Sequence, residues 1–592
     1  MVAGGPVRIA NCSGFYGDRR SAPRELLEGG PLDVLTGDYL AELTMLILWR
    51  SRGRDPAKGY AAGFLAQMEE TLGLALDRGV RVVANAGGLN PAGLAAELRA
   101  LAGRLGLAAR VAHVEGDDLL GRLGELQAAG HDLANADTGV SLAAAGVAPV
   151  TANAYLGGWG IAAALEAGAD VVVTGRVADA SLVVGPAAWH FGWAAGDWDR
   201  LAGATVAGHV LECGTQATGG NYAFMDELPD RRPPGFPVAE VDADGSAVIT
   251  KQPGSGGLVS VGTVTAQLLY EIDGPAYASP DVVARFDTVR VEQAGPDRVR
   301  LSGTRGAPAP ARAKVAVNYL GGFRNSMTFL LTGLDVEAKA AMASAALLER
   351  LGGRGRFQEL SARLVGRPRP DPACQEEAVA ELVVTVKDPD PGRVGRAFSN
   401  ACVELALASY PGCTLTGPPG DATPYGVFWP ALLPADQVRQ QVVLWDGTRL
   451  PVPRPPAGAA PGAVEPPVPA VAEPPDPPGG PTRRVPLGRA FGARSGDKGG
   501  NANLGVWARS PAAYAWLAAF LDVERFRALL PEARDLPVRR HQLPNLLALN
   551  FVVEGLLGEG VSSSTRVDPQ AKGLGEYLRA KLVDLPVALL DD

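Results

Sequence analysis

The apolar positions of the first 230 residues follow two alternating patterns. Short apolar runs, typical of buried strands, are separated by stretches in which apolar residues recur at helical spacing, as at Leu94, Leu98 and Leu101. Such alternation predicts an α/β fold with a mostly parallel sheet and helices on both faces. We therefore assign residues 1–230 to an α/β lobe, with strands at 7–10, 32–35, 80–84, 109–114 and 170–173.

The pattern changes in the next 220 residues, 231–450. Apolar and β-branched runs at hairpin-like spacing predict strands, and two stretches with helical spacing lie among them. The strands are expected within 238–251, 286–302, 314–320 and 381–386, and the helices at 336–351 and 394–409. We assign this region to a second, α+β lobe packed on the first, and a cleft between lobes is a common place for a small-molecule site.

A stretch dominated by Pro, Ala and Gly, residues 451–483, has little apolar surface to bury and predicts an extended linker. It separates the two lobes from a C-terminal domain at 484–592. There we expect strands near Leu487, Asn503 and Leu546, with helices at 511–530 and 573–582. These elements are typical of a small two-layer α+β domain.

Polar residues stand directly after the predicted strands of the first lobe. In open α/β sheets the carboxyl ends of the strands line the ligand crevice, so the repeated placement predicts a binding site. Each residue alone could instead cap a helix or form a turn. The set comprises Asn11, Ser13, Asp18, Asp38, Asn85, Asp117, Arg176 and Asp179.

Arg176 and Asp179 are the most distinctive of these residues. A guanidinium group after a strand is suited to gripping a carboxylate or phosphate with its planar fork. The alternative is a salt bridge from Arg176 to Asp179 or Asp170. Asp179 could be that partner, a metal ligand or a general base, and Asp38 is a second candidate base.

Residues 205–213 are predicted to be helical, which would place His209 and Cys213 on one face as a thiolate–imidazolium pair. Cysteine, however, usually behaves as a small buried hydrophobe. Glu212 is a rival general base, and the glycine-rich segment 214–220 could bring backbone donors near it. Cys12 is a weaker nucleophile candidate, supported only by the neighbouring Asn11 and Ser13.

A glycine-rich loop follows Lys251 and precedes a helix that opens near Ser260. Unpaired backbone N–H groups at a helix start attract anions, and glycine allows a close approach. We expect this loop to hold a phosphate or thioester, although a plain turn explains it too. It is not a P-loop, because Lys251 precedes the glycines. The residues concerned are Lys251, Gly254, Ser255, Gly256 and Gly257.

Composition narrows the function classes. A net charge of −9 and a pI near 5.4, without a basic cluster, argue against a nucleic-acid partner. The longest early apolar run, 43–49, is too short to span a bilayer, and the start of the chain has no signal-peptide pattern. We therefore expect a cytoplasmic protein with no membrane partner. The five cysteines form no CxxC pair and the histidines lack ligand spacing, so no metal is predicted.

Five motifs resemble the acyclic terpene utilisation (AtuA) family. They are Asn11–Asp18, Leu35–Glu42, Thr174–Asp179 and Glu212–Asn221, together with the Lys251 loop and the helix after it. The tail motif 493–503 resembles the ferredoxin-like domain that accompanies this family. The resemblance implies catabolism of branched or isoprenoid-type acids as CoA thioesters, with CoA entering as part of the substrate rather than as a cofactor.

Within that resemblance two classes of function remain open. The first is an enzyme, with a hydratase or lyase step favoured and a Cys213 thioester hydrolase as a variant. The second is a non-catalytic ligand-binding or assembly subunit. Asp497 and Lys498 lie in a glycine-rich tail segment that could bind a phosphate, form a plain hairpin, or serve docking and homo-oligomerisation. A dehydrogenase is disfavoured, since no GxGxxG follows the first strand and Gly157–Gly160 lacks its spacing.

Overall fold

The computed structural model describes residues 5–230, 232–456 and 475–590. The chain forms two compact units. The first unit comprises Met1–Asn318, Phe428–Val561 and Gln570–Asp592, and the second comprises Tyr319–Val427 and Ser562–Pro569. Residues 457–474, the greater part of the predicted linker, lie outside the described residues. In the part of the chain that is described, no helix combines the length and apolar character needed to cross a bilayer.

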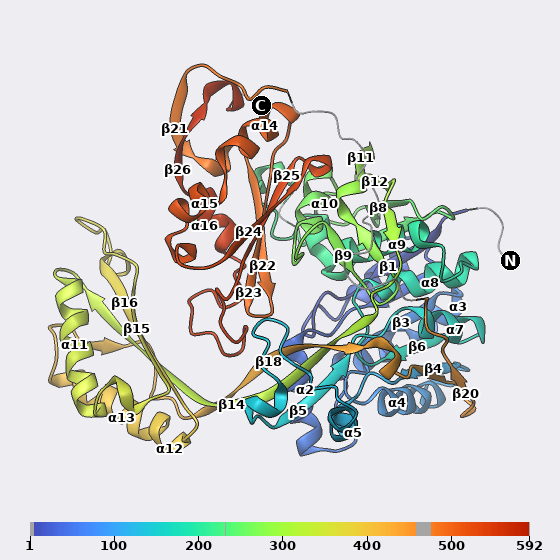
Figure 1. Cartoon of the computed structure of the whole chain (residues 1–592), viewed down its shortest axis with the longest axis horizontal. Coiled ribbons are helices and arrows are strands. Elements are labelled where there is room, and N and C mark those ends of the chain that lie inside the picture. Colours follow the sequence, from blue (N-terminus) through green and yellow to red (C-terminus); the bar gives the residue numbers. More distant parts are fainter. Residues whose placement is uncertain (1–4, 231, 457–474, 591–592) are drawn as a thin grey trace. The chain divides into compact units, whose positions relative to one another are not determined.

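Five parallel strands form the centre of the large sheet in the first unit (Figure 1). Their pairing is continuous, with Ile9 opposite Val34 and Val83 opposite Val172. In spatial order they are β1 (Val7–Asn11), β2 (Val34–Gly37), β3 (Arg81–Ala84), β6 (Val171–Thr174) and β4 (Val111–Glu115). The α/β class and the mostly parallel N-terminal sheet are confirmed.

Helices cover both faces of this sheet, because successive strand side chains point to opposite sides. In β6, Val171 and Val173 pack with α1 (Ala22–Gly29), α3 (Ala62–Asp77) and α4 (Pro91–Arg104). Val172 packs with the opposite group of helices. That group comprises α7 (Trp159–Glu166), α8 (Ser181–Phe191), α9 (Trp198–Glu212) and α10 (Val261–Leu268).

Antiparallel strands extend both edges of the same sheet. On the β1 edge, Val7 pairs with Val241 of β7, so residues that the sequence patterns place in the second lobe join the first sheet. This edge carries β7 (Pro237–Val241), β8 (Ala247–Lys251), β12 (Arg298–Ser302) and β11 (Arg290–Gly295). The other edge carries β19 (Gln441–Val443) and β20 (Arg449–Pro451).

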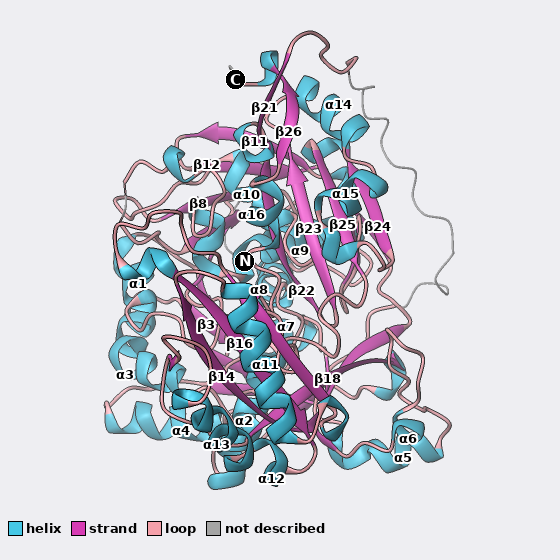
Figure 2. Cartoon of the chain, turned by 90° about the vertical axis from the view of Figure 1, so that its left-hand side faces the viewer, coloured by secondary structure: helices cyan, strands magenta, loops and turns pink. Residues whose placement is uncertain are grey.

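The second unit is an antiparallel sheet with helices. Helix α11 (Val336–Leu351) has the predicted bounds and lies against the sheet (Figure 2). Its Leu347 packs in one cluster with Phe329 and Val384 of the sheet. The other helices are α12 (Pro391–Val394) and α13 (Arg396–Val403). The sheet order is β15 (Glu359–Val365), β16 (Val379–Asp388), β14 (Arg312–Thr332) and β17 (Thr414–Leu415). In the first unit, the start of β14 pairs with β5 (Pro149–Ala154).

The C-terminal part of the first unit has its own antiparallel sheet, which Figure 2 shows strand by strand. Phe526 and Phe551 stack in its core, and the sheet and helices form two layers. The strands in spatial order are β22 (Gly492–Lys498), β23 (Asn501–Trp507), β25 (Ala548–Val553) and β24 (Val538–Leu543). The helices are α14 (Pro511–Phe520), α15 (Val523–Leu529) and α16 (Leu574–Arg579).

Candidate functional site

The carboxyl ends of the parallel strands gather a set of buried polar side chains. Asp38 follows β2 and accepts hydrogen bonds from Asn85 Nδ2 at 2.6 Å and from the Leu40 N–H at 3.3 Å. Asn85 follows β3 and in turn accepts the Tyr39 N–H at 2.7 Å. Both Asp38 and Asn85 are almost completely buried. Neighbouring parallel strands end at the same edge, which is why these distant residues meet.

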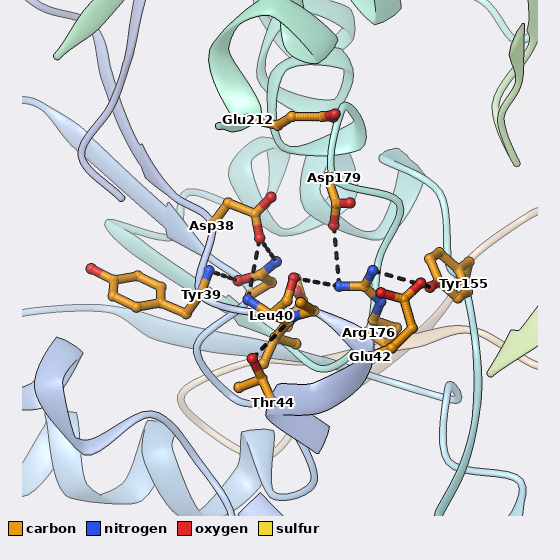
Figure 3. Close-up of polar contacts among 12 residues, drawn as sticks. Asp38, Tyr39, Leu40, Glu42, Thr44, Tyr155, Arg176, Asp179 and Glu212 are labelled. Carbon is orange, nitrogen blue, oxygen red and sulfur yellow. Dashed lines mark hydrogen bonds and ion pairs between the residues drawn. The ribbon is translucent and has the colours of Figure 1, made fainter. Parts of the chain in front are cut away.

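Arg176 is the cation at the centre of this edge (Figure 3). Its guanidinium group donates to the Leu40 carbonyl at 2.9 Å and to the Tyr155 hydroxyl at 3.1 Å, and it lies 3.1 Å from Asp179 Oδ1. It also stacks 4.4 Å from the centre of the Tyr155 ring. Its donors are thus directed to protein groups, and its main effect on chemistry is the charge it places beside Asp179.

Three carboxyl groups from different elements converge next to Arg176. Figure 3 shows Asp38, Asp179 and Glu212 around one region, with Asp179 directed to Arg176, and Glu212 is the last residue of α9. Burial, and then the charge of Asp179, raises the pKa of both Asp38 and Glu212 well above their usual range. Burial also raises the pKa of Asp179, although Arg176 opposes this effect. Closely placed carboxyl groups in a dry site oppose one another's ionisation, so this cluster retains protons to higher pH than exposed carboxyl groups do.

His209 lies one turn before Glu212 in α9, and its ring approaches the Glu212 carboxyl group. Its Nδ1 lies 2.9 Å from Glu212 Oε1, while its Nε2 lies 3.1 Å from the Gln267 carbonyl oxygen. Burial, reinforced by the charge of Lys498, lowers the pKa of His209 to about 4. A neutral ring that donates from Nε2 carries no proton at Nδ1, so it gives the nearby Glu212 carboxylate no positive charge to stabilise it. Both the neutral ring and the raised pKa of Glu212 favour the protonated form of this carboxyl group.

The C-terminal sheet brings Lys498, and Asp497 beside it, into range of the site, where the charge of Lys498 acts on Asp179 and Glu212. Asp497 and Lys498 end β22, and the glycines after them form a two-residue hairpin turn, in which Gly499 has a φ of 62°. The positive φ explains the glycine. Lys498 Nζ donates to the Glu271 carbonyl at 2.8 Å. Burial, and then the charges of Glu271 and Glu42, raises the pKa of Asp497 to about 8.

Asp497 should make folding stability fall as pH rises. A raised carboxyl pKa means that the folded state binds the proton more tightly than the unfolded state does. The stabilisation from this proton is complete below the unfolded pKa near 3.8 and is lost as pH rises through the folded pKa of about 8. We expect Asp497→Asn to gain Tm relative to the unaltered chain between pH 5 and pH 9, by at least about 2 °C. Calorimetry at pH 5, 7 and 9 measures this, with the exposed Asp584→Asn as control in the same domain. A difference in Tm that does not change with pH would contradict the assignment.

The two candidate nucleophilic cysteines lie in environments that oppose a thiolate. Burial, followed by the nearby charges of Glu271 and Glu212, raises the pKa of Cys213 well above its usual range. His209 contacts Glu212 rather than forming the expected pair with Cys213. Burial likewise raises the pKa of Cys12 to about 12, and its sulfur lies 3.8 Å from the Tyr39 hydroxyl.

Asn11 and Ser13 support the cluster through backbone contacts. Asn11 Nδ2 donates to the carbonyls of Leu211 at 2.7 Å and Glu212 at 3.2 Å, and so binds the unpaired end of α9. The Ser13 carbonyl accepts the Asp38 N–H at 3.1 Å. Together these bonds fix the positions from which Glu212 and Asp38 project.

The Lys251 loop is occupied by a carboxylate of the protein itself. Asp297 Oδ1 accepts the Val259 N–H at 2.8 Å, and Asp297 Oδ2 lies 3.1 Å from Lys251 Nζ. Lys251 also donates to the Ser255 carbonyl at 2.9 Å. At the start of α10, the Ser260 hydroxyl accepts the Thr263 N–H. The anion-binding groups expected here are therefore used within the protein.

Within this loop the glycines serve close packing. Gly256 accepts the Gly235 N–H at 2.9 Å, and the Gly254 carbonyl accepts from Arg232 at 3.1 Å. Gly257 has a φ of 83°, and a Cβ there would lie 2.2 Å from the Thr218 carbonyl oxygen. Among the described residues, no hydrogen bond or ion pair joins the loop to the Asp38–Asp179–Glu212 cluster.

Several residues of the site were not among the candidates predicted from the sequence. Glu42 begins α2 (Glu42–Arg54) and accepts from the Tyr155 hydroxyl at 2.9 Å, with Lys314 Nζ at 3.4 Å. Burial alone would raise the pKa of Glu42, but Lys314 and Arg176 lower it to about 2. Glu42 is the last residue of the motif Leu35–Glu42, and Tyr155 directly follows β5. Their positions after strands are the sequence feature that could have identified them as members of the site.

Metal-binding side chains and the Gly157–Gly160 turn both bear on whether a cofactor could bind. Among the described residues, no group of three or more His, Cys, Asp or Glu side chains is arranged to hold a metal ion. At the Gly157–Gly160 turn, both carboxylate oxygens of Asp281 accept the Gly158 N–H, at 2.9 and 3.0 Å. Ser181 Oγ also donates to Asp281, so this helix start is filled by a protein carboxylate.

Two family models match the chain over most of its length. The model of the acyclic terpene utilisation family protein AtuA matches residues 7–444, and the model of the AtuA ferredoxin-like domain matches residues 485–584. No curated protein and no solved structure matched the chain. The second match covers the C-terminal α+β sheet and confirms its predicted class. Since the first model covers well over half of the chain, the protein belongs to the acyclic terpene utilisation (AtuA) family and carries its ferredoxin-like domain at the C-terminus.

Proposed function

We propose that the protein is a cytoplasmic catabolic enzyme that adds or removes water, or cleaves a carbon–carbon bond, in a branched or isoprenoid-type acid or its CoA thioester. The family's link to acyclic terpene utilisation supports a catabolic role. The observation that carries the proposal is the convergence of Asp38, Asp179 and Glu212 beside Arg176, with raised carboxyl pKa values. Such a cluster offers a proton donor and a proton acceptor within one dry site.

The two roles follow from the neighbours of each group. Arg176, 3.1 Å away, favours a charged Asp179, which suits it to act as the base. Burial and the neutral His209 favour a protonated Glu212, which suits it to act as the acid. In hydration, Asp179 takes a proton from water while the water oxygen bonds to the β-carbon. The double-bond electrons pass to the α-carbon, which takes a proton from Glu212.

The test is a panel of branched acyl-CoA thioesters and free hydroxy acids incubated with the purified protein, with products followed by mass spectrometry. A mass change of 18 Da indicates hydration or dehydration, and smaller fragments indicate a lyase. Tight binding without turnover across the panel would instead support the second class, a non-catalytic ligand-binding or assembly subunit.

A further inference from the structure

Glu271 has a backbone conformation that its own sequence does not explain. Its φ is 56°, in the left-handed region that a residue with a side chain rarely adopts. It follows α10, and both of its backbone polar groups are bound by the C-terminal sheet. The Glu271 N–H donates to Asn503 Oδ1 at 2.7 Å, and the Glu271 carbonyl accepts from Lys498 Nζ at 2.8 Å. The C-terminal domain thus supports this turn at two points.

A second buried amide completes the support. Asn503 Nδ2 donates to Asn550 Oδ1, and Asn550 Nδ2 donates to the Ile272 carbonyl at 3.3 Å. Both asparagines have no exposed surface. Buried amides are costly unless all of their bonds are made, so each must be matched to this turn.

The turn bears on the cluster because the charge of Glu271 acts on it. The charge of Glu271 is among the causes that raise the pKa of Glu212, and burial raises the pKa of Glu271 itself. The charge of Lys498 acts to lower the pKa of Glu271, Glu212 and Asp179, so its ammonium group lies within electrostatic range of these carboxyl groups. It also lies 6.0 Å from the centre of the Tyr277 ring. Lys498 is therefore a cation contributed to the cluster by the ferredoxin-like domain.

We infer that the ferredoxin-like domain completes the candidate active site. Asn503 positions Glu271 through its N–H, Asn550 supports Asn503 and the Ile272 carbonyl, and Lys498 places a positive charge where it binds an anionic oxygen of the substrate. The class of group that suits Lys498 is the carboxylate or developing enolate oxygen of an acyl substrate. The substrate part of this inference rests on the proposed function. The positioning part stands on the contacts alone.

The positioning part is tested by hydrogen exchange on the full chain. We expect Asn503→Ala to speed exchange of the Glu271 amide at least about ten-fold, because its acceptor is removed. Lys498→Met leaves the Asn503–Asn550 bond in place and should loosen the same turn less. Lys581→Met, whose ammonium group bonds Tyr577 in the same domain, is the control. Unchanged exchange in residues 265–275 of Asn503→Ala would overturn the positioning role.

The substrate part is tested by steady-state kinetics on whichever acyl substrate is turned over. We expect Lys498→Met to lower kcat/KM at least about ten-fold, Lys498→Arg to recover part of it, and Lys581→Met to match the unaltered enzyme. Normal kcat and KM in Lys498→Met would refute the cation's role while leaving the proposed function intact. If the unaltered chain turns over no substrate, the proposed function fails, the substrate role of Lys498 fails with it, and hydrogen exchange still decides the positioning role.

Discussion

Glu212→Gln should lower kcat by about 10²- to 10⁴-fold, the range typical of a lost general acid or base. Glutamine keeps the shape of the side chain but cannot give or take a proton at the carboxyl position. The buried carboxyl group already has a strongly raised pKa, so a neutral amide should fit without a large loss of stability. The measurement is single-turnover kinetics on the substrate found in the panel, together with Tm.

The matched control for this variant is Glu240→Gln. Glu240, in strand β7 of the large sheet, is a buried glutamate like Glu212, but it pairs with Arg8 and Arg298 rather than with the cluster. We expect that variant to lose stability and keep kcat. If Glu212→Gln kept kcat within about three-fold of the unaltered enzyme, well short of the effect of a lost proton donor, Glu212 would not be the acid.

Arg176→Met is expected to produce the largest loss of stability, about 3–5 kcal/mol in the free energy of unfolding. The change removes the buried cation that offsets Asp179 and leaves the Leu40 carbonyl and Tyr155 hydroxyl without their donor. Chemical denaturation followed by fluorescence measures the loss. Adding Asp179→Asn should recover part of it, because the double variant no longer buries an unpaired carboxylate.

The comparison for Arg176 is Arg110→Met, which breaks an ion pair to Asp170 at 2.9 Å beside the same strand. The Arg110 side chain is 46% exposed, so water screens that pair and the loss should stay below about 1 kcal/mol. Equal losses in the free energy of unfolding would show that the Arg176–Asp179 ion pair contributes no more than an exposed pair does, and would contradict the central role of Arg176.

Local sequence predicted the strand ends well for a clear reason. The predicted strand 7–10 is β1 at Val7–Asn11, and 170–173 is β6 at Val171–Thr174. Asp38, Asn85 and Arg176 meet because parallel strands carry their carboxyl ends to one edge. Periodicity and polar strand ends are local properties, so one sequence sufficed to identify this part of the candidate site.

The Lys251 loop shows where local pattern failed to define a ligand. Glycines and a helix start predict an anion, but they do not say which one. The anion is Asp297, which lies between β11 and β12. Those strands join the large sheet by antiparallel pairing. The hydrophobic pattern of a strand does not reveal which other strand it pairs with, so the position of Asp297 could not be predicted from it.

The amino-acid sequence by itself determined the α/β class, the family and the row of polar residues at the strand ends. The tertiary structure alone decided that Glu271 and Lys498, 227 residues apart, are in contact. It also decided that the His209 ring lies against the carboxyl group of Glu212 rather than the thiol of Cys213. The physical reason is one of range. Helical and strand periods act over a few residues, whereas the pKa of a buried carboxyl group depends on every charge that the fold brings near it.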